Sequence, residues 1–245
     1  MTCSASAADH RTVLITGASR GIGAETARAF AGRGWTLLLL ARNGHALEAL
    51  ADELRDVAAA VHWASVDLAD PVAIAPGVAD LTRRGGTPSV LINNAGAAYT
   101  GGLASMPLED WQWLLQLNLT SIFQVTQALL APMRQAGGGL IINVGSHAAG
   151  KAFPGWGAYG ISKAGLAAFS QYLAAEEAPH GIRVTTLTLG AVDTPLWDTR
   201  TVQADFDRHA MLRPTQVAAA LLQLAEHPTQ QLVEQLTLMP TAGAL

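Results

Sequence analysis

Two reactive side chains stand four residues apart in a stretch that is otherwise rich in glycine and alanine, GWGAYGISKAGLAAFS at residues 155–170. If this stretch is helical, the Tyr159 phenol and the Lys163 ammonium project from one face and can act on a common ligand. The pKa of a free phenol is about 10, and a nearby positive charge lowers it toward the range in which a proton can be exchanged at neutral pH. Such a pair also occurs by chance on exposed helices, so its meaning depends on the rest of the chain.

A glycine cluster follows the first apolar run, in TGASRGIG at residues 16–23. Gly17, Gly21 and Gly23 would let the backbone approach a pyrophosphate, whose charge the N-terminus of the following helix stabilises. Three residues and then one separate the glycines, whereas the common dinucleotide fingerprint has one and then two. A tight turn also needs glycine, but the position between a strand and a helix favours a nucleotide site.

The charges near this loop bear on the choice of dinucleotide. Ala41, Arg42 and Asn43 follow the second apolar run, where NAD-specific folds place an acidic residue against the ribose. Arg42 and Arg20 could instead hold a 2′-phosphate through charge-assisted hydrogen bonds. The sequence therefore favours NADP(H), the alternative being that both arginines are solvated surface residues.

The elements that must position these groups form a regular alternation. Near-continuous apolar runs separated by helical segments are typical of a parallel sheet that is covered on both faces. We therefore predict an α/β fold, a doubly wound, mostly parallel seven-stranded sheet with helices on both faces, the Rossmann fold. Ligands bind at the carboxyl ends of such strands. The predicted strands are residues 12–16, 36–41, 60–65, 89–96, 139–146, 182–189 and 234–239.

The composition excludes several other classes. Half of the 245 residues are hydrophobic and 14% are charged, which fits a globular protein rather than a disordered one. A net charge of −4 offers no basic surface for nucleic acid, and no segment reads as a membrane span, a signal peptide or a metal site. The single cysteine, Cys3, cannot form an internal disulfide, so we expect a cytoplasmic protein. No linker divides the chain, which predicts one domain over residues 1–245 with a flexible tail at 1–10.

From Thr12 to about Met239 the chain resembles the short-chain dehydrogenase/reductase family. The resemblance rests on motifs that occur in order, each at the end of an expected strand or helix. They are the glycine loop at 16–23, Asp67 in SVDLAD, NNAG at 93–96, Asn118 in LNLTS, Ser146 in NVGS, and Tyr159 with Lys163 in YGISK.

The resemblance implies an NADP(H)-dependent oxidoreductase that transfers a hydride between nicotinamide and a carbonyl or secondary alcohol. By the same resemblance, Tyr159 is the general acid or base, and Lys163 tunes it and binds the nicotinamide ribose. Ser146 would hold the substrate oxygen, and Asn118 would hold a water that relays protons to Lys163. Taken alone, the serine and the asparagine could serve local backbone hydrogen bonds only.

The resemblance also implies the cofactor site and shows one departure from the family pattern. Asp67 would meet the adenine or merely cap a turn. Where the family usually reads Asn-Pro-Gly, this chain has Thr188, Leu189 and Gly190, so the segment loses the rigidity of a proline. The implied cofactor-binding residues are Gly17, Ser19, Arg20, Gly21, Ile22, Gly23, Arg42, Asp67, Leu68, Asn94, Ala95, Gly96, Tyr159, Lys163, Val192 and Thr194.

Residues 190–213 correspond to a mobile substrate lid in the family. We expect the substrate to contact Ser146, His147, Trp156, Tyr159 and Trp197. Three more side chains, Phe153, Phe206 and Met211, would complete an apolar and aromatic pocket, although each of them could equally cover core or a subunit interface. We expect Arg200, Arg208 and Arg213 to face solvent. This pocket predicts that lipophilic or aromatic carbonyl compounds outperform small 2-oxo acids.

Two other functions remain open at this point. A 3-oxoacyl carrier-protein reductase would need a basic patch for its acidic partner, and only the adjacent Arg83 and Arg84 suggest one. A non-catalytic NADPH-binding redox sensor would not need the four catalytic residues together. The family resemblance further implies a homodimer or homotetramer, packed through helices near residues 107–133 and 157–180.

Overall fold

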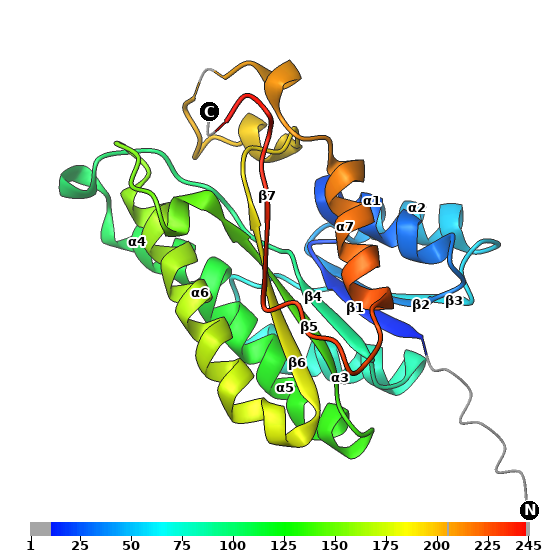
Figure 1. Cartoon of the computed structure of the whole chain (residues 1–245). Helices are drawn as coiled ribbons and strands as arrows, with labels where there is room; N and C mark the ends of the chain where they lie inside the picture. The colour runs from blue at the N-terminus through cyan, green and yellow to red at the C-terminus, as the bar shows by residue number, and fades with distance from the viewer. Residues whose placement is uncertain (1–10, 205, 244–245) are drawn as a thin grey trace, which may run out of the picture.

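The computed structural model describes residues 11–204 and 206–243, so the predicted tail at 1–10 lies outside the described residues. Seven strands form one sheet in the order β3-β2-β1-β4-β5-β6-β7 (Figure 1). Every neighbouring pair is parallel, which confirms the predicted doubly wound sheet. The strands are β1 (Thr12–Thr16), β2 (Thr36–Ala41), β3 (Ala60–Ser65), β4 (Val90–Asn93), β5 (Gly139–Ser146), β6 (Ile182–Leu189) and β7 (Gln235–Leu238).

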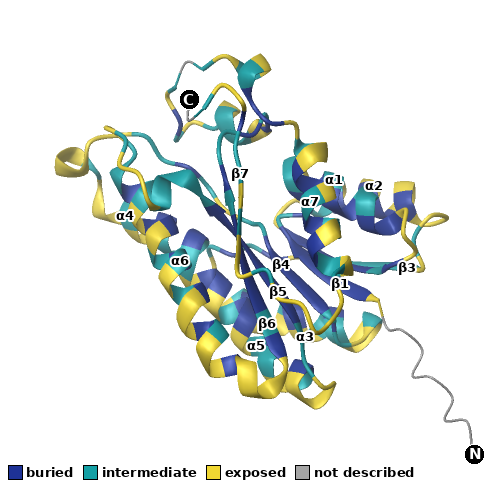
Figure 2. Cartoon of the chain, in the orientation of Figure 1, coloured by how far each residue is buried: buried dark blue, intermediate teal, exposed yellow. Residues whose placement is uncertain are grey.

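Helices cover both faces of the sheet, and the apolar strand residues divide between them. Val13 and Ile15 of β1 pack in the cluster beneath α1, α2 and α7, whereas Leu14 packs in the cluster beneath α3, α5 and α6. Figure 2 shows the buried sheet between helices whose outer surfaces are exposed. The helices are α1 (Gly21–Ala31), α2 (Gly44–Leu54), α3 (Pro71–Gly85), α4 (Leu108–Leu115), α5 (Ser121–Gln135), α6 (Gly157–Glu177) and α7 (Pro214–Glu226).

The strand order reverses at β1, which lies between β2 and β4. The chain passes from β1 through β2 to β3 on one side and then crosses back to β4 on the other. A doubly wound sheet leaves a crevice at such a point, outside the carboxyl ends of its strands. The glycine loop begins at the end of β1 and NNAG begins at the end of β4, and both lie beside this crevice.

A continuous helical run, residues 108–135, joins α4 to α5 through the π-helical turn η2 (Gln116–Thr120). By length and composition this is the one described stretch that could cross a membrane. Its residues Val125, Leu129 and Met133 are nevertheless buried in the core cluster of α3, α5 and α6. The run therefore has a packing role in this fold.

Short helices of a single turn lie between several of the main elements. The region 190–213 contains η5 and η6 and makes one isolated parallel bridge, between Val192 and Leu212. It lies beyond the carboxyl ends of β6 and β7, near the C-terminal end of the chain (Figure 1). The short helices are η1 (Leu103–Ser105), η3 (His147–Ala149), η4 (Ala178–His180), η5 (Pro195–Asp198) and η6 (Arg208–Ala210).

Candidate active site

A cavity of about 830 Å³ opens at the carboxyl ends of the central strands. It extends from the glycine loop after β1 to the region 190–213 after β6. We call these two parts the glycine-loop end and the lid end. Tyr159 and Lys163 of α6 line the cavity together with residues from both ends.

The glycine loop has the backbone that only glycine adopts freely. Gly17 and Gly21 have φ angles of 68° and 56°, and both line the cavity. Gly23 does not line the cavity. A Cβ there would stand 2.2 Å from the Gly17 carbonyl oxygen, so Gly23 packs directly against the turn. The structure therefore places Gly23, predicted as a cofactor-binding residue, where it permits close packing of helix and turn.

Thr16 fastens NNAG to the glycine loop. Its hydroxyl oxygen accepts hydrogen bonds from the backbone N–H groups of Asn94 and Ala95, both at 3.0 Å. The Asn94 side-chain amide returns a hydrogen bond to the Thr16 carbonyl oxygen at 3.0 Å. These contacts hold Asn94, Ala95 and Gly96 on the cavity wall, as predicted.

Two guanidinium groups stand at the glycine-loop end without a partner among the described residues. Arg20 and Arg42 are exposed, line the cavity, and make no side-chain hydrogen bond or ion pair with the described residues. Asp67 both lines the cavity and caps a turn, since its carboxylate accepts a hydrogen bond from Ala69 N–H at 3.0 Å. Ser19, Ile22 and Leu68 also line this end.

The buried lysine is held by the sheet. Lys163 is 6% exposed, and its Nζ donates a hydrogen bond to the Val144 carbonyl oxygen at 2.9 Å. Burial disfavours the ammonium form and lowers the pKa of Lys163 to about 8. This lysine is therefore poised to change protonation state near neutral pH.

The tyrosine responds to burial in the opposite direction. Desolvation raises the pKa of Tyr159, and a hydrogen bond with the Ser146 hydroxyl lowers it by less. The expectation that Lys163 brings the Tyr159 pKa below its usual value is thus wrong for this structure, because burial dominates. Tyr159 remains a proton donor at neutral pH.

Asn118 lies beneath the cavity wall in η2. It is fully buried, and it exchanges two hydrogen bonds of 2.9 Å with the backbone of Ala97, one accepted by Oδ1 and one donated by Nδ2. A third hydrogen bond runs from Nδ2 to the Ser162 hydroxyl at 3.0 Å. A Cβ on Gly96 would stand 3.1 Å from Asn118 Oδ1 and 3.7 Å from Lys163 Nζ, so the amide and the ammonium flank the same glycine.

Aromatic side chains form the wall of the lid end. The rings of Tyr159 and Trp156 lie 5.8 Å apart, those of Trp156 and Trp197 lie 5.9 Å apart, and those of Trp197 and Phe206 lie 5.3 Å apart. Each pair has the edge-to-face geometry that aromatic rings favour. We call these four residues the aromatic wall.

Most other predicted substrate residues lie where expected, with one exception. Ser146, His147 and Phe153 line the cavity, and the Ser146 hydroxyl also accepts a hydrogen bond from Ala148 N–H at 3.2 Å. Met211 is buried and does not line the cavity, so its predicted place in the pocket is wrong. Met211 thus follows the alternative open in the sequence, in which such a side chain covers the core.

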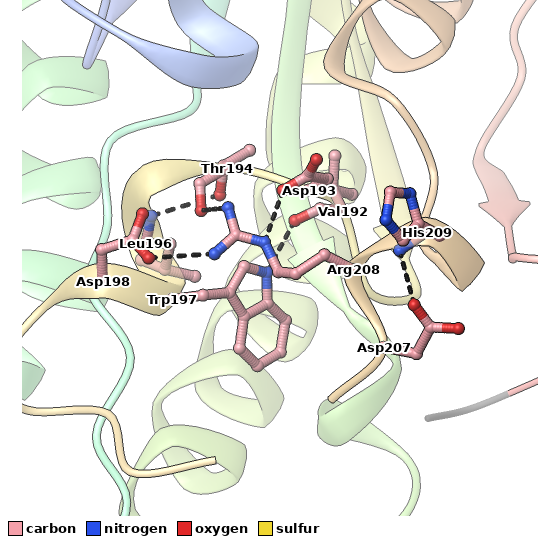
Figure 3. Close-up of polar contacts among 9 residues, drawn as sticks. All are labelled: Val192, Asp193, Thr194, Leu196, Trp197, Asp198, Asp207, Arg208 and His209. Atoms are coloured by element: carbon pink, nitrogen blue, oxygen red, sulfur yellow. Dashed lines mark hydrogen bonds and ion pairs between the residues drawn. The ribbon is translucent and has the colours of Figure 1, made fainter. Parts of the chain in front are cut away.

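The three lid arginines differ in their surroundings. Arg213 is exposed, as expected, but Arg200 lines the cavity and Arg208 bonds to other residues of the lid. Arg208 donates to Asp193 Oδ1 at 2.5 Å, to Asp198 Oδ1 at 3.0 Å and to the Thr194 carbonyl oxygen at 3.1 Å (Figure 3). The expectation that these side chains face solvent is therefore wrong for Arg208, whereas Arg200 is exposed and also lines the cavity.

A contact between the lid and the loop after NNAG could not be expected from the sequence. Thr100 N–H donates to the Thr201 carbonyl oxygen, and the Thr201 hydroxyl donates to the Ala98 carbonyl oxygen, both at 2.8 Å. Thr201 also lines the cavity, as do Trp113 and Leu117. No local pattern links residues one hundred positions apart. The departure from the family pattern leaves Leu189 and Gly190 on the cavity wall at the end of β6, beside Val192 and Thr194.

Comparison with known proteins agrees with this geometry. A Rossmann-type sheet with a glycine-lined crevice defines the class of dinucleotide-binding oxidoreductases. The family model for short chain dehydrogenase matches residues 11–205. The chain belongs to the short-chain dehydrogenase/reductase family, and it is an oxidoreductase of that family.

Individual relatives cover nearly the whole chain. Sulfoacetaldehyde reductase 2 of Chromohalobacter salexigens is 34% identical over 240 residues, which are 95% of this chain and 95% of the relative. Serine 3-dehydrogenase of Rhizobium radiobacter is 33% identical over 236 residues, or 94% of this chain and 93% of the relative.

Solved structures agree with the fold and indicate a nicotinamide cofactor. The alcohol dehydrogenase of Thermococcus sibiricus complexed with 5-hydroxy-NADP has a TM-score of 0.86 at 28% identity, covering 94% of this chain and 97% of that one. The closed form of serine dehydrogenase complexed with NADP+ has a TM-score of 0.86 at 28% identity, covering 96% of each chain.

Proposed function

We propose that this protein transfers a hydride between NADP(H) and a carbonyl or secondary alcohol, with Tyr159 as the general acid or base. The observation that carries the proposal is the place of Tyr159 on the wall of one continuous cavity. Its hydroxyl is hydrogen-bonded to Ser146, its ring packs against Trp156, and Lys163 stands one helical turn away on the same wall. This is the arrangement that proton transfer to a carbonyl oxygen needs.

The residues of the cavity fit NADP(H). The positive φ angles of Gly17 and Gly21 open the loop to a pyrophosphate, and the guanidinium groups of Arg20 and Arg42, which no described residue pairs with, could bind a 2′-phosphate. Ser19 and Ile22 would hold the phosphates, Asp67 and Leu68 the adenine, and Val192 and Thr194 the nicotinamide amide. When bound, the cofactor supplies or accepts the hydride.

The protein's own groups would move the proton. Ser146 would hold the carbonyl oxygen by hydrogen bond while Tyr159, kept protonated because burial raises its pKa, donates to that oxygen. Lys163, with a pKa of about 8, would then return a proton to the tyrosine. Asn118 lies beside Gly96, as Lys163 does, and would hold a water that returns a proton to the lysine.

The aromatic wall supports neutral lipophilic or aromatic carbonyl compounds as substrates, because burying apolar surface contributes about 25 cal/mol per Å². A second candidate is a small anionic carbonyl compound bound by Arg200. The place of Arg200 on the cavity wall favours it, and two relatives are named for sulfoacetaldehyde and serine, which carry charged groups.

The two other functions have less support. One relative, from Chlamydia trachomatis, is a 3-oxoacyl-[acyl-carrier-protein] reductase that is 34% identical over 188 residues. However, Arg83 and Arg84 both pair with Asp80, so they form no free basic patch for an acidic carrier. A redox sensor without turnover would have no need for Tyr159, Ser146 and Lys163 on one wall.

A matched screen tests the proposed reaction. Oxidation of NADPH and of NADH would be followed with aromatic ketones, neutral aldehydes, sulfonated or carboxylated aldehydes and 3-oxoacyl thioesters. We expect turnover of a carbonyl compound with NADPH, and Arg200→Gln should weaken anionic substrates only. Tight NADPH binding with no turnover of any compound would instead favour the sensor.

We also propose one domain, a cytoplasmic location and a homodimer or homotetramer. The exposed apolar residues Phe123 of α5 and Ile161 and Tyr172 of α6 offer a face for twofold packing. Light scattering at micromolar concentration tests the assembly, and a monomer would exclude it.

A further inference from the structure

Arg208 makes three hydrogen bonds to three separate groups of the lid. The acceptors are the carboxylates of Asp193 and Asp198 and the backbone carbonyl of Thr194, one for each nitrogen of the guanidinium (Figure 3). Arg208 belongs to η6, whereas its partners lie in and just before η5. The side chain therefore ties the second half of the lid to the first, and we call this contact the arginine clasp.

The clasped residues adjoin groups that line the cavity, although Arg208 itself does not line it. Thr194 and Trp197 are on the cavity wall at one side of the clasp, and Phe206 is on the wall two residues before Arg208. The Trp197 indole N–H donates to the Val192 carbonyl oxygen at 2.7 Å, which fixes the ring between those of Trp156 and Phe206. The clasp thus joins both segments that carry the outer part of the aromatic wall.

Backbone hydrogen bonds beside the clasp also join the two lid segments. Asp193 N–H donates to the Leu212 carbonyl oxygen at 2.8 Å, and Leu212 N–H donates to the Ala191 carbonyl oxygen at 3.0 Å. Asp207 caps η6 by accepting from His209 N–H at 2.9 Å (Figure 3). These backbone bonds bring the segment of Arg208 close to the segment that carries its two carboxylate partners.

We propose that Arg208 is a positioning residue that sets substrate specificity. Acting through Thr194, Trp197 and Phe206, it holds the proposed nicotinamide contact and the aromatic wall in one fixed arrangement. This inference rests on the proposed oxidoreductase function for its kinetic consequence, but not for its structural one. Without the clasp, the two lid segments would separate more readily and the wall would lose its outer ring.

The variant Arg208→Lys tests the clasp, because lysine keeps the charge but cannot present three donors in a planar fork. Arg28 offers a matched control. It makes three hydrogen bonds to Glu25 and Glu53, far from the cavity, and its side chain is 39% exposed against 37% for Arg208. Arg28→Lys therefore repeats the same chemical change outside the lid.

The first measurement is amide hydrogen exchange of residues 193–199 and 208–212 without any substrate. We expect exchange there to be about fivefold faster in Arg208→Lys, the increase that loss of a partly exposed ion pair gives, and unchanged in Arg28→Lys. Asp198→Asn should speed exchange in the same two segments. Exchange in both lid variants as slow as in the unmodified protein would overturn the proposal.

The second measurement separates positioning from a merely structural role. With an aromatic carbonyl compound and saturating NADPH, Arg208→Lys should raise KM about fivefold and leave kcat nearly unchanged, because Tyr159 and Ser146 are not displaced. A loss of kcat alone, or an equal change in Arg28→Lys, would contradict the assigned role. If the unmodified protein reduces no carbonyl compound, the proposed function fails, while the exchange experiment still decides whether the clasp exists.

Discussion

The two ends of the cavity are built from different kinds of structure. At the glycine-loop end, backbone turns between regular elements shape the site, and the guanidinium groups of Arg20 and Arg42 have no partner among the described residues. At the lid end, side chains shape the site, and Arg208 uses its donors on other lid residues. The first end thus offers charge to a ligand, whereas the second offers mainly apolar surface in a frame held by its own charges.

The largest expected effect tests whether cofactor binding depends on the glycine-loop end and proton transfer on the other end. Tyr159→Phe keeps the ring against Trp156 but removes the proton donor, so turnover should fall by roughly a hundredfold or more. NADPH affinity should change little, because the glycine-loop end is untouched. The check is kcat beside the NADPH dissociation constant, and near-normal turnover would mean that another group donates the proton.

The next effect concerns Lys163, which lies where the two ends meet. Its folded-state pKa of about 8 is below the usual 10.5, so between these values the unfolded chain binds more protons and stability rises with pH. That rise should reach up to about 3 kcal/mol, and Lys163→Met should lack it. Urea unfolding from about pH 7 to about pH 10 measures the slope.

The only other lysine supplies the control for this experiment. Lys151 is exposed, so Lys151→Met should keep the slope of the unmodified protein. Parallel curves for the unmodified protein and Lys163→Met would show that burial does not lower the Lys163 pKa.

A third prediction acts on the glycine-loop end alone. Arg42→Asp replaces an exposed guanidinium on the cavity wall with a carboxylate that would repel a 2′-phosphate, and it should weaken NADPH relative to NADH by about 1.5 to 3 kcal/mol. Titration with both cofactors measures the difference, with Arg213→Asp as a control outside the cavity. Equal affinity for both cofactors in the unmodified protein would remove the basis for NADP(H) preference.

The smallest effect acts on the lid end alone. Trp197→Leu removes the middle ring of the wall between Trp156 and Phe206, and it should cost an aromatic substrate about 1 kcal/mol in kcat/KM. A small aliphatic aldehyde, which cannot reach these rings, serves as the control substrate. If both substrates lost the same amount, the wall would have no part in selecting them.

The sheet could be predicted from the sequence because its strands are apolar runs, and β1, β2, β4 and β5 are buried on both faces. The predicted and observed bounds of β1, β2, β3, β5 and β6 are the same. The prediction extended β4 to residue 96, but the strand ends at Asn93 because the N–H groups of Asn94 and Ala95 bond to the Thr16 hydroxyl instead of a neighbouring strand. The residues of the glycine loop and of the other motifs could also be placed from the sequence, because a parallel sheet brings the carboxyl ends of its strands together.

The lid was less predictable because its contacts follow no period. Arg208 meets Asp193 and Asp198 through a turn whose path depends on the whole segment, and Thr201 meets Thr100 from a distant part of the chain. The pKa of Tyr159 was also misjudged. The sequence shows a lysine nearby but not the degree of burial, and burial raises the Tyr159 pKa by more than the Ser146 hydrogen bond lowers it.

The lid's place outside the seven strands bears on how the protein can diverge. In its described part, the region 190–213 has the Val192–Leu212 bridge as its only β pairing, and the clasp is internal to it. Its exposed residues, such as Arg200 and Gln203, can be substituted without touching the strands, whereas Thr194 packs against Gly21 and Val192 belongs to the core cluster. A descendant could vary the exposed part of this segment and acquire a pocket of another shape, while it kept the sheet, Tyr159 and Lys163 of its ancestor.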